Sequence, residues 1–189
     1  MMKIYPSHIS VLDQTLLPSQ TLYLDIKDIK SAYESIEKMK VRGAPLIAVV
    51  ALEGLRIELR NYFNSHNIFN EKKEISKENE ENNEKTSELI GLAQTKTFLK
   101  SNIDYIRKSR PTAVNLANDT EALWSEVNRY EGSLEGFYEV VASFVVKNFK
   151  EYEQACIDMS RKGADAILGL EKLKNKEKVS ILTICNTGF

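Results

Sequence analysis

Cysteine and histidine are scarce in this sequence, which holds two residues of each (Cys156, Cys185, His8 and His66) among 189. The two cysteines form no CxxC pair, and a structural zinc site needs about four clustered nitrogen or sulfur ligands. A chain of this length also buries enough apolar surface to fold without covalent staples. The sequence therefore predicts no metal site, and it favours two reduced cysteines, with a Cys156–Cys185 disulfide as the alternative.

Charge of one sign is not in excess either, because 26 Lys and Arg face 27 Asp and Glu. Nucleic-acid-binding proteins concentrate positive charge on one face, so the even balance argues against such a partner. The longest apolar run, Ala44–Leu52, has nine residues, about half of the roughly 18 that a membrane helix needs. The first residues contain no signal-peptide core. We expect a soluble intracellular chain without a membrane partner, in the cytoplasm and, as a further option, the nucleus.

Residues 71–88 differ in composition from the rest of the chain. Eleven of these eighteen residues are charged, and only Ile75 is large and apolar. Such a stretch buries too little surface to offset the entropy lost on ordering. It is predicted to be a solvated, disordered insertion; an acidic interaction segment is the alternative.

The chain before the insertion predicts two strands and two helices. Ile9–Leu12 and Thr21–Ile26 are runs of β-forming residues on either side of a turn. Asp28 then precedes apolar residues at helical spacing, as an N-cap does. Gly43 breaks this helix, and a second one, from about Pro45 to Phe63, is apolar nearly all round in its first half. That half should be buried.

Helices predominate after the insertion. One is predicted from Leu89 to Lys108 and a second after Ser109–Thr112, with Thr112 as its N-cap. A long helix begins near Leu134, and Gly163 is expected to end it as a C-cap. Its apolar residues recur in steps of four and three, which predicts a core-facing seam. The seam consists of Phe137, Val141, Val145, Phe149, Tyr152, Cys156 and Met159.

The last residues predict the start of a different kind of fold. A short helix at 164–172 leads to Val179–Ile184, an apolar run typical of a strand buried on both faces of a parallel sheet. Parallel neighbours need crossovers of a dozen or more residues, and the chain ends at Phe189. We therefore expect an α+β N-terminal domain with few strands and about five to six helices, followed by the first strand of a truncated Rossmann-like α/β domain. The expected divisions are 1–130 for the first domain, 131–178 for linking helices and 179–189 for the truncated domain.

Two turns combine an arginine with the start of a helix. In Arg42-Gly43-Ala44-Pro45, the first-turn N–H groups have no helical partner and the helix dipole is positive. An adjoining guanidinium adds charge, so the turn can bind a phosphate or a carboxylate. Arg110-Pro111-Thr112 repeats the pattern. The alternative for both is an ordinary capped turn with a solvated arginine.

The two cysteines receive different interpretations. Cys185 follows the predicted strand, where open α/β sheets place ligand-binding groups, and small polar residues follow it. A catalytic role and a role as a small buried apolar residue stay open for it. Cys156, on the apolar seam, is predicted to be a buried apolar residue.

Four segments together resemble the methylthioribose-1-phosphate isomerase family, which is related to the regulatory subunits of the exchange factor for translation initiation factor two. They are LDQTLLP, VRGAPLIAVVALEGL, SRPTAVNLANDTEAL and ILTICNTG. The resemblance covers essentially the whole chain apart from the insertion. Several motifs in the same order make it specific.

This resemblance implies an N-terminal portion of a two-domain enzyme that converts 5-methylthioribose 1-phosphate to 5-methylthioribulose 1-phosphate in methionine salvage. It implies no metal or nucleotide cofactor, a sugar phosphate as substrate and a homodimer when full length. Carried over by motif, Arg42, Gly43, Ala44 and Arg110 bind substrate, and Cys185 is the catalytic-site cysteine.

The resemblance also implies groups that this sequence does not contain. The family's proton-donating acid, a substrate-binding Gln and an Asn-Lys pair belong to the part after the CNTG loop, where Phe189 ends the chain. We therefore expect the 189-residue chain to be inactive alone. The alternative function is that of a non-catalytic relative of the exchange-factor regulatory subunits.

Overall fold

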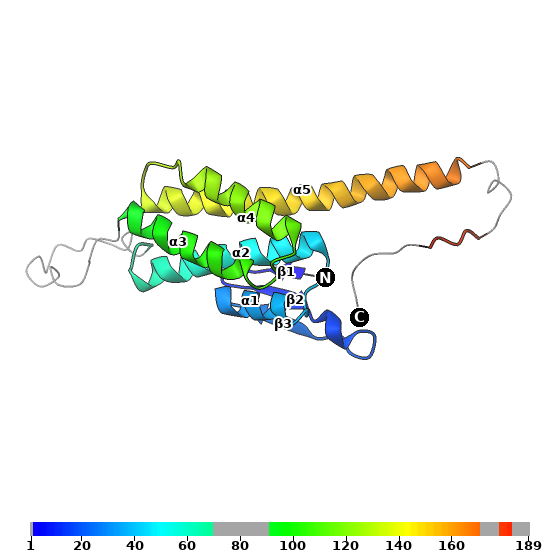
Figure 1. The fold of residues 1–189 in the computed structure, drawn as a ribbon, viewed down its shortest axis with the longest axis horizontal. Coiled ribbons are helices and arrows are strands. Elements are labelled where there is room, and N and C mark those ends of the chain that lie inside the picture. Colours follow the sequence, from blue (N-terminus) through cyan, green and yellow to red (C-terminus); the bar gives the residue numbers. More distant parts are fainter. Residues whose placement is uncertain (1, 70–90, 171–177, 183–189) are drawn as a thin grey trace, which may run out of the picture. The chain divides into compact units, whose positions relative to one another are not determined.

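The computed structural model describes residues 2–69, 91–170 and 178–182 (Figure 1). These residues form three strands, one short 3-10 helix and five α-helices, which agrees with the expected α+β composition. The chain divides into two compact units, Met1–Val145 and Val146–Phe189. The charged insertion at 71–88 lies outside the described residues, so its disorder stays a prediction.

The three strands form an antiparallel sheet in the order β1–β2–β3. The predicted pair is confirmed as β2 (Ile9–Leu12) and β3 (Tyr23–Ile26), in which Ile9 lies opposite Ile26. Both isoleucines are fully buried. The edge strand β1 (Met2–Ile4) was not predicted, because three residues are too few to establish an alternation.

Asp28 caps helix α1 (Ile29–Glu37), as predicted. Its carboxylate accepts a hydrogen bond from the Ser31 backbone N–H at 2.7 Å, and Ser31 Oγ accepts one from the Asp28 N–H at 3.2 Å. This reciprocal pair satisfies two N–H groups that helix geometry leaves open. Met39 was expected to continue the helix face, but it follows the helix end with φ of 56°.

Helix α2 (Ala44–Ser65) is the centre of the first unit, and α1, α3 and α4 all pack against it (Figure 1). Its residues are buried almost continuously from Ile47 to Ile57. A helix that is apolar all round must be covered on every side. The predicted burial of its first half is thus confirmed.

Helices α3 (Leu92–Arg107) and α4 (Val114–Val127) match the two helices predicted after the insertion. The predicted N-cap of the second was wrong. Ala113, not Thr112, occupies the N-cap position, and no side chain caps the helix there. The N-cap residue of α4 therefore supplies no side-chain hydrogen bond to its first turn.

Helix α5 (Leu134–Leu168) corrects the prediction that Gly163 ends a helix and that a separate one follows. Gly163 lies inside the helix, and Gly43 is the one described glycine with a positive φ. A glycine in a helix interior lowers helix stability by about 1 kcal/mol relative to alanine. The many backbone hydrogen bonds of the 35-residue helix offset this loss. Among the described residues, no helix combines the length and apolar character needed to cross a membrane.

The apolar seam of α5 is buried only as far as Val145. Phe137, Val141 and Val145 belong to the core of the first unit, whereas Cys156 and Met159 are exposed. The predicted burial of Cys156 is therefore wrong in this structure. The described residues of the second unit supply no further helix or sheet that could cover the seam.

The predicted strand Val179–Ile184 is not formed over its described part, residues 179–182, where Ile181 and Leu182 are highly exposed. A strand requires ladder hydrogen bonds to a neighbour, and the described part of the chain contains no strand that pairs with this segment. Cys185 lies outside the described residues.

Candidate anion-binding site

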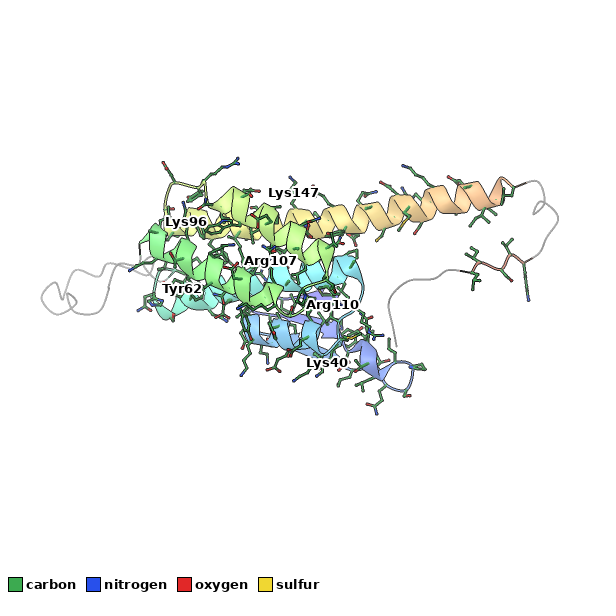
Figure 2. The ribbon with its side chains drawn as sticks, in the orientation of Figure 1. Lys40, Tyr62, Lys96, Arg107, Arg110 and Lys147 are labelled. Carbon is green, nitrogen blue, oxygen red and sulfur yellow. The ribbon has the colours of Figure 1, made fainter. Side chains whose placement is uncertain are left out.

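Two of the predicted site turns lie at the same end of the first unit. Helices α2 and α4 pack against each other and run in the same direction, so that both begin on the right of that unit in Figure 1. Figure 2 shows Lys40 and Arg110 at this end. The turn before α2 contains Arg42, and the turn before α4 contains Arg110. Packing of the two helices thus gathers positive helix ends and cations in one region.

At the first turn, Gly43 occupies the N-cap of α2 with φ of 97°. L-amino acids rarely adopt this conformation, which explains the glycine. Among the described residues, no atom lies within 4 Å of the point where a Cβ would stand, so this part of the chain leaves space for a ligand at the backbone. Pro45 has no N–H, and the N–H groups of Ala44 and Leu46 belong to the first turn, which lacks helical acceptors.

Substituting Gly43 with alanine is expected to reduce the free energy of unfolding by at least about 1 kcal/mol, because an alanine is strained by the positive φ, although its Cβ would meet no atom of the described residues. Gly163→Ala is the matched control: the site is helical and open, so the same change should stabilise the chain by up to about 1 kcal/mol. Urea denaturation measures both. If Gly43→Ala and Gly163→Ala had equal free energies of unfolding, the proposed backbone strain at residue 43 would be contradicted.

At the second turn, a pocket of about 250 Å³ opens between the end of α3 and the start of α4. Its lining comprises Arg107, Lys108, Arg110, Pro111, Ala113, Leu116 and Ala117, and we call it the cationic pocket. Arg107 Nη1 is also 3.2 Å from Glu121 Oε2, which holds this arginine in place. Arg110 is half-buried, so less water screens its charge than at a fully exposed site.

Backbone hydrogen bonds shape this pocket. The Ala113 N–H donates to the Arg110 carbonyl at 3.0 Å, and Ser109 Oγ donates to the Ile106 carbonyl at 2.6 Å. The tight turn directs the chain from α3 into α4, whose uncapped start forms one wall. Three cations beside the positive end of a helix are chemically suited to a phosphate or carboxylate.

The predicted site residues are only partly brought together. Arg110 lines the cationic pocket, whereas Arg42, Gly43 and Ala44 do not line it and lie at the neighbouring helix start. The predicted catalytic residue, Cys185, lies outside the described residues. Sequence reasoning missed Arg107 and Lys108; the signal was three cations within four residues at a helix end.

The described residues define an α+β unit in which two helix starts with adjoining arginines lie at one end. The chain belongs to the Initiation factor 2 subunit family, whose model matches residues 40–189.

A methylthioribose-1-phosphate isomerase from Leishmania major is 32% identical over 194 residues, which cover 98% of this chain and 44% of that protein. One from Vanderwaltozyma polyspora is 34% identical over 185 residues, covering 95% and 40%. The chain therefore spans less than half the length of these relatives.

Two solved structures share the fold. A 5-methylthioribose 1-phosphate isomerase from Pyrococcus horikoshii matches 79% of this chain and 35% of its own, with a TM-score of 0.62 and 20% identity. The translation initiation factor eIF-2B subunit delta from A. fulgidus matches 78% of this chain and 36% of its own, with a TM-score of 0.58 and 22% identity. At these identities the likeness establishes the fold alone.

Proposed function

We propose that this chain is the substrate-binding part of a methylthioribose-1-phosphate isomerase. The observation that carries the proposal is the match to isomerases of that name over 95–98% of this chain at 32–34% identity. The cationic pocket supports it independently, because a sugar phosphate carries the charge that such a pocket attracts. The proposal includes a cytoplasmic enzyme that acts as a homodimer without a metal or nucleotide.

In the proposed reaction, a hydrogen moves from C2 of the sugar to C1, the ring bond between C1 and O4 breaks, and the C2 hydroxyl proton passes to O4. C2 is thereby oxidised to a carbonyl while C1 is reduced. The phosphate stays on C1 throughout. Arg42, Gly43, Ala44 and Arg110 would hold it, and Arg107 and Lys108 would add charge at the pocket. Cys185 would lie beside the reacting carbons, as an acid, a base or a stabiliser of developing charge.

Calorimetric titration of the chain with 5-methylthioribose 1-phosphate tests the binding role. Arg110→Ala should weaken binding by about 1.5–3 kcal/mol, or roughly ten- to a hundredfold, as expected for a lost hydrogen bond to a charged group. Arg129→Ala, in the exposed loop after α4, should leave the affinity unchanged. Unphosphorylated 5-methylthioribose should not bind measurably. Equal binding of both sugars, or of both variants, would contradict the proposal.

A chimera tests the reaction itself. Replacing the matching part of the Leishmania major relative with this chain should yield turnover that Cys185→Ser and Arg110→Ala each reduce strongly. Catalytic groups that act as a unit are non-additive, so the 189 residues alone should show no turnover. A chimera that folds but is inactive would contradict the isomerase assignment.

The structural match to the eIF-2B subunit favours a second candidate, a non-catalytic relative of exchange-factor regulatory subunits. Such a protein would act through interfaces, and it would have no need of selective sugar-phosphate binding. A chain that binds neither sugar, together with an inactive chimera, would favour this second function.

A further inference from the structure

The LDQTLLP segment has no role in the function proposed so far, yet the structure connects it to the Arg42–Gly43–Ala44 turn. It spans Leu12–Pro18, beginning at the last residue of β2, and contains the 3-10 helix η1 (Gln14–Leu16). Gln14 bonds the turn at two points. Its backbone N–H donates to the Lys40 carbonyl at 2.8 Å, and its Nε2 donates to the Arg42 carbonyl at 3.3 Å.

Asp13 holds Gln14 in place. The Asp13 carboxylate is almost fully buried, and it accepts hydrogen bonds from the Thr15 N–H at 3.0 Å and from Thr15 Oγ1 at 2.6 Å. Lys40 Nζ lies 3.9 Å from its other oxygen. The same acidic residue therefore fixes the start of η1 and approaches the turn that Gln14 bonds.

A trans peptide is planar, so its N–H points away from its C=O. When a carbonyl accepts a hydrogen bond from Gln14, the orientation of that peptide is fixed, and so is the direction of the N–H of the following residue. At the first, the Lys40 carbonyl points to Gln14 and the following N–H, of Val41, donates to the Ser35 carbonyl at 3.1 Å. At the second, the Arg42 carbonyl points to Gln14, so the Gly43 N–H is directed away from this loop.

We propose that Gln14 is a positioning residue of the substrate-binding turn: by holding the Arg42 carbonyl, it orients the Gly43 N–H toward the phosphate of the bound sugar. This inference rests on the proposed function. The open space at Gly43 leaves room for the phosphate to approach. The Gln14 side chain does not touch the ligand; it acts through the Arg42–Gly43 peptide.

Glycine-labelled protein offers a specific readout, because the chain has only eight glycines and amide shifts respond to hydrogen bonding. Titration with inorganic phosphate and with 5-methylthioribose 1-phosphate should shift the Gly43 amide of the wild-type chain. Gln14→Met keeps the side-chain length, adds no charge and removes the donor. We expect it to abolish the Gly43 shift and to weaken sugar-phosphate binding roughly tenfold, equivalent to about 1.4 kcal/mol.

Two controls separate positioning from a general structural effect. Gln20→Met makes the same change in the same loop at an exposed side chain, and it should leave both readouts unchanged. In uniformly labelled Gln14→Met, ligand-induced shifts of the Asn115 and Leu116 amides at the start of α4 should persist, because that turn does not depend on Gln14. Loss of all shifts together would indicate damage to the fold and would contradict the positioning role.

The remaining outcomes distinguish this inference from the proposed function. If the Gly43 shift persists in Gln14→Met at wild-type size, the role of Gln14 is wrong while the binding function stands. If the wild-type chain shows no shift at Gly43 and binds no sugar phosphate, the proposed function is wrong and the positioning role with it.

Discussion

Replacing Arg56 with methionine is expected to lower the free energy of unfolding by about 3–5 kcal/mol, because it leaves a buried carboxylate without its counter-charge. Arg56 Nε donates to Glu53 Oε2 at 2.7 Å, and Arg56 Nη1 donates to Tyr138 Oη at 3.2 Å. Glu53 is only 1% exposed and Arg56 9%. The pair lies on α2 and its tyrosine on α5, so the loss should also weaken the attachment of α5.

The same environment acts on the guanidinium itself. Burial alone would lower the pKa of Arg56, but the adjacent Glu53 carboxylate and the hydrogen bonds to Glu53 and Tyr138 outweigh it and raise the pKa above its usual value. Arg56 therefore stays protonated at every pH at which the protein folds, and a change of pH cannot remove the positive charge of the Glu53–Arg56 pair.

Urea denaturation at pH 7 measures the expected loss, and two further variants define its cause. Glu53→Leu combined with Arg56→Met removes both charges, and it should recover most of the stability, since an apolar pair of similar volume is often as stable as a buried ion pair. Lys147→Met breaks an exposed pair in which Lys147 Nζ lies 3.9 Å from Glu151 Oε1 (Figure 2), and it should change little. A double variant no more stable than Arg56→Met would contradict this account.

Replacing Gly54 with valine is expected to cost roughly 3 kcal/mol, because α1 packs directly on the α2 backbone there. A Cβ at Gly54 would lie 2.6 Å from Ala32 Cβ and 3.5 Å from Ile29 Cδ1. Both neighbours belong to α1, and a Cβ cannot move away without its backbone. The helix would have to shift, and the Arg42 turn that joins it to α2 would shift with it.

An exchange of side chains tests the contact between Gly54 and Ala32. Gly54→Ala alone should be destabilising, whereas Gly54→Ala combined with Ala32→Gly leaves a single Cβ at the contact and should recover stability. A double-mutant cycle in urea gives the coupling energy. A coupling near zero, or a Gly54→Val variant as stable as the wild type, would show that the two helices separate without cost.

The local features of the fold could be predicted because neighbouring residues specify them. Asp28 caps α1 through an atom three residues away, and Gly43 precedes α2 as its N-cap. The prediction that Gly43 ends the first helix was wrong, because α1 already ends at Glu37. The apolar circumference of α2 dictates its central position. Periodicity could not locate β1, because a three-residue strand has too few residues to show an alternation.

The errors arose where burial depends on partners that periodicity does not reveal. The seam of α5 keeps its apolar spacing beyond Val145, but Cys156 is exposed there. The run at 179–182 has the composition of a strand, but it has no neighbour among the described strands. The spacing of apolar residues indicates which side chains lie on the same face of a helix or strand. It does not indicate whether another element packs on that face.

The sequence by itself determined that helices α1 to α4 form, the cap at Asp28, the two arginine turns and the family resemblance, because each depends on residue types at short or fixed spacing. Only the tertiary structure decided that the turns of Arg42 and Arg110 share one end, since this follows from the parallel packing of α2 against α4. It also decided that Arg107 and Lys108 join Arg110 in a pocket and that Gln14 bonds the Arg42 carbonyl. The last pair is 28 residues apart in the chain, and only the packing of the strand–helix layers brings such residues within hydrogen-bond distance.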